Sequence, residues 1–119
     1  DVRKIAEELT DRSTSPVGVL ALIVFVGIFT PISEELFFRG LLYGTLRKKL
    51  NLAPRNCIWV SAIIASAIFS IVHFQWILLP ALFGVGLLFN ILYERTGRLA
   101  PAIWAHAGFN GVTLINLLI

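Results

Sequence analysis

Residues 17–43 read VGVLALIVFVGIFTPISEELFFRGLLY, a long apolar stretch that contains Glu34, Glu35 and Arg39. At about 1.5 Å per residue, a helix of this length is more than long enough to cross a hydrocarbon core of about 30 Å. Charged side chains are strongly disfavoured at such positions, so they need partners and a purpose. The stretch therefore predicts a membrane helix whose charged residues carry a function.

Three more apolar runs follow, over residues 58–74, 77–93 and 99–119, and each could cross or nearly cross a bilayer. Of the 119 residues, 57% are hydrophobic and only 14% are charged, and the mean hydropathy is +0.84. A soluble domain rarely tolerates this composition. We therefore predict an all-α fold, an integral membrane helical bundle with about four transmembrane helices in one compact domain.

The N-terminal segment, residues 1–15, places apolar and charged residues on opposite faces of a short helix. It is predicted to lie along the membrane interface, which leaves residues 16–119 as the core of the bundle. Ser15 is a candidate N-cap, with Pro16 at the first helical position. The segment has no initiator Met and no signal-peptide pattern, so we expect the chain to be a piece of a longer protein.

Proline and glycine residues predict where the helices bend, pack and stop. Pro31 removes an amide donor three residues before Glu34, which predicts an interruption of the first helix at that point. Gly84 and Gly86 suit close packing or a bend, and we expect close packing. Gly97 is typical of a helix C-terminus.

The net charge of +3 comes mainly from two connections, residues 44–56 and 94–99, whereas the connection at 74–76 is uncharged. The positive-inside rule therefore places both basic loops in the cytoplasm. Orientation and attraction of membrane lipid explain this basicity fully, and we expect no nucleic acid partner. The partners predicted are membrane lipid and a membrane-associated substrate.

The helical angle separates the roles of the two adjacent glutamates. Arg39 lies about 40° from Glu35 around the helix but about 140° from Glu34. Glu35 therefore pairs with Arg39, and the pair allows both charges to persist in a medium of low dielectric. Glu34 faces elsewhere without a local counter-charge, as suits a general base or acid, although a transport path or an interhelical hydrogen bond would also use it.

Two further pairs have a spacing of four residues. Phe69 precedes His73 by one helical turn, so its ring can orient the imidazole, and His106 precedes Asn110 in the same way. His106 and Asn110 can offer two N–H donors to one point, as an oxyanion requires. A capping or interfacial histidine and a polar pair that joins two helices are the simpler alternatives.

The expected depths of the three candidate site residues in the membrane do not agree when they are counted along the chain. From the nearest basic residue, Glu34, His106 and His73 lie about 20, 12 and 27 Å into the membrane at about 1.5 Å per residue. The three can meet only if a helix tilts or extends beyond the bilayer. A shared site near the midplane or in the cytoplasmic half is the resulting prediction.

Together the motifs EExxxR at residues 34–39, FxxxH at 69–73 and HxxxN at 106–110 resemble the CPBP family. This family of intramembrane proteases includes the type 2 CAAX prenyl endopeptidases, Abi-type immunity proteins and proteins like lysostaphin resistance protein A. The resemblance implies a CPBP-like core over residues 16–119 in a bacterial or archaeal cell membrane. It also implies an endopeptidase that hydrolyses a peptide bond in a membrane-associated protein or peptide.

The resemblance further implies a role for each motif residue. Glu34 would activate the water as the base, and His73 would help to hold that water. His106 and Asn110 would form the oxyanion site. Structural support would come from Glu35, Arg39 and Phe69.

The need for a metal ion follows less directly. The family is traditionally classed as metallopeptidase, and Glu34, His73 and His106 could supply three ligands to Zn²⁺. The chain has no H-E-x-x-H helix, and Asn110 would be a poor fourth ligand. We therefore expect catalysis without a metal or other cofactor.

Two functions of other classes stay open from the residues. Buried glutamates and histidines could form the relay of an ion or proton carrier, although such carriers usually have more helices and repeated halves. The chain could also be a non-catalytic immunity or partner-binding membrane protein that keeps a protease core.

Overall fold

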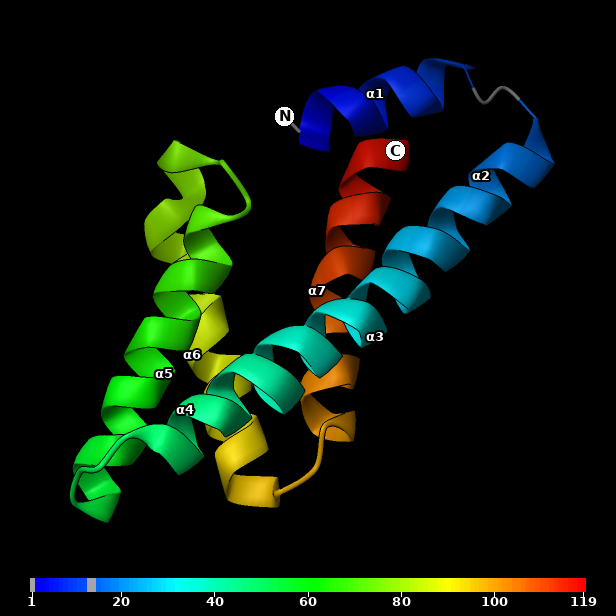
Figure 1. Ribbon diagram of the computed structural model, residues 1–119. Coiled ribbons are helices and arrows are strands. Elements are labelled where there is room, and N and C mark those ends of the chain that lie inside the picture. Colours follow the sequence, from blue (N-terminus) through cyan, green and yellow to red (C-terminus); the bar gives the residue numbers. More distant parts are fainter. Residues whose placement is uncertain (1, 13–14) are drawn as a thin grey trace.

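The computed structural model describes residues 2–12 and 15–119, and helices make up most of them (Figure 1). The predicted all-α fold is confirmed within these residues. Asp1, Ser13 and Thr14, which belong to the predicted interfacial segment, lie outside them, and the interfacial position of that segment stays a prediction. The elements are α1 (Val2–Arg12), α2 (Pro16–Val24), η1 (Phe25–Phe29), α3 (Thr30–Glu35), η2 (Leu36–Tyr43), α4 (Gly44–Lys49), α5 (Pro54–Ile71), η3 (Trp76–Leu78), α6 (Leu79–Thr96) and α7 (Ala100–Leu118).

The elements α2 to α4 form one continuous helical run, Pro16–Lys49. Its start is as predicted, because the Ser15 hydroxyl accepts a hydrogen bond from the Gly18 amide at 3.2 Å and Pro16 follows in the first turn. Two parts of the run, η1 and η2, have the wider π-helical hydrogen-bond register. Such π-helical segments are frequent at functional sites, and here they flank the two glutamates.

The interruption at Pro31 takes the form of this change in register. Just before it, the Thr30 amide bonds to the carbonyl of Phe25, five residues back. In the same register the Val26 carbonyl would pair with residue 31, but proline has no N–H to donate. The side chain of Asn110 on α7 donates to Val26 instead, at 3.0 Å. A carbonyl left unpaired by Pro31 thus becomes a contact between two helices.

The helices α5 and α6 form an antiparallel hairpin beside the long first run (Figure 1). They pack closely at Gly86, where a Cβ atom would lie 3.2–3.3 Å from Phe69 and Ser66, whereas Gly84 faces open space. Close packing is therefore confirmed at one of the two predicted glycines. Gly97 ends α6 in the left-handed conformation with a φ of 65°, as predicted.

The second helix is shorter than its apolar run, because α5 ends at Ile71 rather than continuing to residue 74. The FxxxH motif had suggested that His73 lies on the helix. The structure instead places His73 in the turn that follows the helix. Phe74 follows in the left-handed region with a φ of 52°, which ends the helical path. The change of direction orients the His73 ring toward the other helices of the bundle.

Three helices are long and apolar enough to cross a membrane, Pro16–Lys49, Pro54–Ile71 and Trp76–Thr96, within the residues that the structure describes. The fourth predicted span forms the single helix α7, which has a length of 19 residues. It has no charged residue, but it contains the polar residues His106, Asn110 and Asn116. The membrane bundle is confirmed.

The distribution of side chains is the reverse of that in a soluble protein. Glu35, Arg39 and Asn90 are fully buried, while Ile77 and Trp104 are 94% and 75% exposed. An apolar exterior around a polar interior suits a chain surrounded by lipid, because buried polar groups can satisfy one another there. The polar residues that could form a functional site therefore lie inside the bundle.

The predicted basic loops are largely helical. Residues 44–49 form α4 and Arg55 lies in the first turn of α5, so the first connection contains only residues 50–53. Both basic regions lie at the same end of the bundle (Figure 1). There the Glu94 carboxylate accepts hydrogen bonds from Arg47 at 2.9 and 3.0 Å and from Tyr43 at 2.7 Å. This cluster ties the first run to α6, and its cytoplasmic location stays a prediction.

Candidate active site

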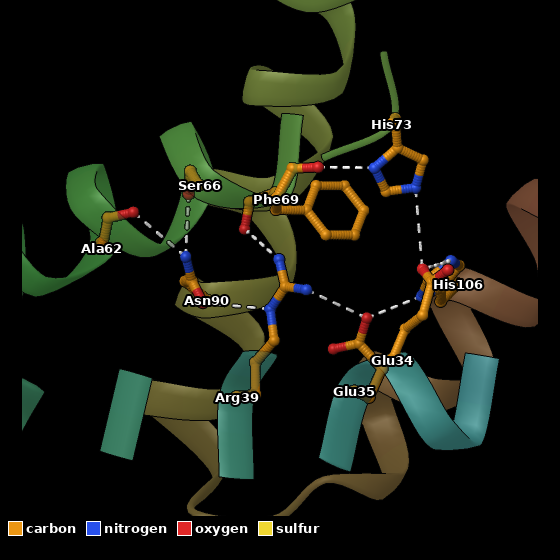
Figure 2. A network of polar contacts seen from close by, with 10 residues as sticks. Glu34, Glu35, Arg39, Ala62, Ser66, Phe69, His73, Asn90 and His106 are labelled. Carbon is orange, nitrogen blue, oxygen red and sulfur yellow. Dashed lines mark hydrogen bonds and ion pairs between the residues drawn. The ribbon is translucent and has the colours of Figure 1, made fainter. Parts of the chain in front are cut away.

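Glu34, His73 and His106 come together inside the bundle, as the motifs predicted (Figure 2). The Oε2 atom of Glu34 lies 3.4 Å from Nε2 of His106 and 3.7 Å from Nε2 of His73. These residues come from α3, from the turn after α5 and from α7. Three segments far apart in the sequence thus place one carboxylate between two imidazoles.

The orientation of His73 is set by its own chain. Its Nδ1 atom contacts the carbonyl oxygen of Phe69, and a carbonyl can only accept a hydrogen bond. Nδ1 therefore carries a proton, and Nε2 is the atom directed at Glu34. The Phe69 ring packs against the imidazole with a centroid distance of 4.6 Å, which confirms the predicted orienting contact.

His106 is held by the other glutamate. Its Nδ1 atom lies 2.7 Å from Oε1 of Glu35, and both side chains are nearly or fully buried. A carboxylate at Nδ1 fixes the orientation of the ring. Glu35 was predicted to support Arg39 alone, so this second contact extends its role to positioning His106.

The pairing of Glu35 with Arg39 is confirmed. Nη1 of Arg39 donates to Oε1 of Glu35 at 3.1 Å, and both side chains are at most 1% exposed. Arg39 also donates from Nη2 to the Gly86 carbonyl at 2.7 Å and from Nε to Oδ1 of Asn90 at 3.0 Å. Its guanidinium lies over the rings of two phenylalanines, as a desolvated cation favours.

Asn90 is a supporting residue that the motifs did not identify. Its Nδ2 group donates to the Ser66 hydroxyl at 2.8 Å and to the Ala62 carbonyl at 3.2 Å, while its oxygen accepts from Arg39 (Figure 2). A single amide thus joins η2, α5 and α6. Its polar side chain within the apolar run 77–93 was the available signal, because such residues seldom lack a partner.

Asn110 has a different contact from the one predicted. It lies one turn after His106 on α7, but its Nδ2 donates to the Val26 carbonyl, the acceptor freed by Pro31. An Asn amide has two hydrogens, so this bond leaves one for another acceptor. The role of Asn110 at an oxyanion stays a prediction.

Exposure distinguishes the two carboxylates. The Glu34 side chain is 27% exposed and that of His73 is 23% exposed, whereas Glu35 is fully buried. The Oε2 atom of Glu34 is itself buried and has no hydrogen-bond partner among the described residues. Glu34 is therefore the partly exposed carboxylate of the two, while Glu35 is enclosed by its neighbours.

The ionisable groups alternate in charge along the network when His106 is protonated. Arg39 is followed by Glu35, then by His106, and then by Glu34. Alternation allows each buried charge to be compensated by its neighbour in a medium of low dielectric. The arrangement can support a reactive carboxylate beside an imidazolium that donates a hydrogen bond.

The same three side chains were the predicted ligands of a possible zinc ion. Within residues 2–12 and 15–119, no group of three or more His, Cys, Asp or Glu is placed so that it could hold a metal ion. Independence from Zn²⁺ stays a prediction that biochemical measurement must test.

The fold and site together define an α-helical membrane protein in which a carboxylate and two imidazoles from different segments meet. The chain belongs to the type II CAAX prenyl endopeptidase Rce1-like family, which matches residues 16–112. The resemblance inferred from the three motifs is thereby confirmed.

Curated bacterial relatives support this assignment. The chain is 32% identical over 97 residues to the "Membrane-embedded CAAX protease MroQ" of Staphylococcus aureus, a match that covers 82% of this chain and 39% of MroQ. It is 34% identical over 101 residues to the "Putative membrane peptidase YdiL" of Bacillus subtilis, covering 85% of this chain and 39% of YdiL. The chain thus spans about two fifths of the length of these relatives. No solved structure matches it significantly.

Proposed function

We propose that this protein is an intramembrane endopeptidase that hydrolyses a peptide bond in a membrane-associated protein or peptide. The observation that carries the proposal is the Oε2 atom of Glu34, which has no hydrogen-bond partner among the described residues and has Nε2 of His106 at 3.4 Å and Nε2 of His73 at 3.7 Å. A carboxylate in this position can take a proton from a water that the imidazoles orient. The membership in a CAAX endopeptidase family supports the same reaction.

In the proposed mechanism, Glu34 removes a proton from water as the water oxygen bonds to the peptide carbonyl carbon. The carbonyl π electrons move to its oxygen and give a tetrahedral oxyanion. The Nε2–H of protonated His106, and the second Nδ2 hydrogen of Asn110, donate to this oxyanion. When the C–N bond breaks, Glu34 gives its proton to the leaving amine, so the base returns to its starting form.

The supporting residues preserve the geometry of this reaction. Glu35 holds the His106 ring through Nδ1, and Arg39 compensates the charge of Glu35. His73 holds the water through Nε2. We propose that the reaction needs no metal ion, because the side chains of His106 and Asn110 can supply two N–H donors to the oxyanion.

The test is cleavage of membrane-anchored peptides, prenylated and unmodified, by the protein reconstituted in liposomes. Glu34→Gln is expected to lower the rate by at least about 100-fold, as is usual when a general base is lost. Glu8→Gln makes the same chemical change at an exposed residue of α1 and should leave the rate unchanged. If Glu34→Gln and His73→Ala both cleave as fast as the parent, the assignment is wrong.

The proton-carrier alternative is favoured by one observation, the continuous chain of ionisable groups from His73 to Arg39. The chain ends at Arg39, whose guanidinium stays protonated, and at the non-titrating amide of Asn90. A relay that ends at these two groups has no exit for a proton. Proton flux into liposomes that is lost in Glu34→Gln, without any peptide cleavage, would support the carrier instead.

A further inference from the structure

A pocket lies between α5 and α6 at the basic end of the bundle, away from the turn that carries His73. Its volume is about 290 Å³. It is formed where the start of α5 packs beside the end of α6, which the antiparallel hairpin brings together. The residues that decide its chemistry are Arg55, Arg95, Ile58, Trp59, Ile91 and Glu94.

The two arginines give this pocket its positive charge. Arg55 and Arg95 are exposed, and neither forms an ion pair or a side-chain hydrogen bond among the described residues. The negative charge of Glu94, which also lines the pocket, is balanced by its ion pair with Arg47, so the two arginines remain in excess. The pocket therefore offers two free guanidinium groups to an anion.

The walls of the pocket distinguish a lipid from a soluble anion. Trp59 is 50% exposed, and Ile58 and Ile91 are half-buried beside it. Tryptophan and arginine at the end of a membrane helix are typical of the headgroup level of a bilayer. A phosphate between the arginines would leave the glycerol and the upper acyl chains against these apolar side chains.

We propose that this pocket binds an anionic phospholipid, with Arg55 and Arg95 on the headgroup phosphate and Trp59, Ile58 and Ile91 against the glycerol region. A zwitterionic headgroup fits less well because its choline cation would face the two arginines. The lipid site does not depend on the proposed peptidase activity.

The test uses the fluorescence of Trp59 in a protein that carries Trp76→Phe and Trp104→Phe, which leaves one tryptophan of the three. The protein is reconstituted in phosphatidylcholine with either phosphatidylglycerol or phosphatidylcholine brominated on its acyl chains, a quencher of short range. Phosphatidylglycerol is expected to quench Trp59 at lower mole fraction. Replacement of each arginine by Gln should reduce this preference about fivefold.

A matched control separates the pocket from the general charge of the surface. The double change Lys48→Gln and Lys49→Gln removes two positive charges, as the change of both arginines would, but from exposed residues that do not line the pocket. It should alter the preference less than about twofold, because its effect on lipid accumulation is diffuse. The absence of any preference in the parent, or an equal loss in the lysine and arginine variants, would overturn the proposal.

Inorganic phosphate at millimolar concentration distinguishes the two sources of the anion. It should leave the quenching by phosphatidylglycerol unchanged, because it has no contact with the apolar walls. Displacement of the brominated lipid by phosphate would identify a site for the free anion and overturn the lipid assignment. Far-UV circular dichroism of each variant confirms that the helices are retained.

Discussion

The replacement of Asn90 by alanine tests the buried network that holds the candidate site. Asn90 is fully buried and forms three hydrogen bonds, to Arg39, Ser66 and the carbonyl of Ala62. Alanine removes all three and leaves Nε of Arg39 without its acceptor. Because this amide joins three elements, we expect a loss of stability rather than a local adjustment.

The magnitude follows from the kinds of bond that are lost. The two bonds that Asn90 donates are between neutral groups, and such interhelical bonds in membranes contribute about 0.6 kcal/mol each on average. The bond from the charged Arg39 contributes about 1.5–3 kcal/mol. Asn90→Ala should therefore lower the free energy of unfolding by about 3 kcal/mol.

The assay is equilibrium unfolding by SDS in mixed micelles, followed by far-UV circular dichroism. Asn116→Ala makes the same substitution at an exposed residue of α7 and should change the stability by less than about 0.5 kcal/mol. In a double-mutant cycle, Ser66→Ala should show a coupling of about 0.6 kcal/mol with Asn90→Ala. Equal stability of the Asn90 and Asn116 variants would refute the reasoning.

Three other predictions use the same protein. Gly86→Ala should destabilise it by about 1–3 kcal/mol, because the added Cβ would lie 3.3 Å from Ser66 and force the hairpin apart, whereas Gly84→Ala meets no atom within 4 Å and should be neutral or stabilising. Glu94→Gln should cost about 1 kcal/mol, because it weakens a half-buried ion pair with Arg47, and high salt should narrow the difference. Any peptide cleavage should proceed at the same rate with and without a strong chelator.

Each of these predictions has an outcome that contradicts it. Equal effects of the two glycine substitutions would show that α5 and α6 do not approach at Gly86. A Glu94→Gln protein as stable as the parent would remove the energetic role of the cluster with Arg47. Loss of cleavage in chelator, with recovery on addition of Zn²⁺, would falsify the metal-free mechanism.

The local order of residues was sufficient to predict several features of the site. The spacing of four residues assigned Arg39 to Glu35 and left Glu34 facing elsewhere, and the structure confirms this division. The same spacing predicted the packing of Phe69 on His73. These contacts lie within one turn of a helix, where the geometry is nearly independent of the rest of the chain.

Contacts between helices could not be predicted from the spacing of residues along one helix. Depths counted along the helices placed Glu34, His73 and His106 at different levels, yet both imidazoles lie within 3.7 Å of the carboxylate. The early end of α5 and the packing of the helices bring these side chains together, and neither is encoded by spacing. The contact between Asn110 and Val26 likewise depends on how α7 packs against the interruption at Pro31.

The sequence by itself determined that this chain is a helical membrane protein, where its first helix begins and its third helix stops, and which polar residues carry its family motifs. These properties follow from hydropathy and from hydrogen bonds between neighbours along the chain. Only the tertiary structure decided that Glu35 holds His106, that Asn90 anchors Arg39, and that Glu34 is the accessible carboxylate. Such choices depend on interhelical distances of a few ångströms, which the packing of the whole bundle sets.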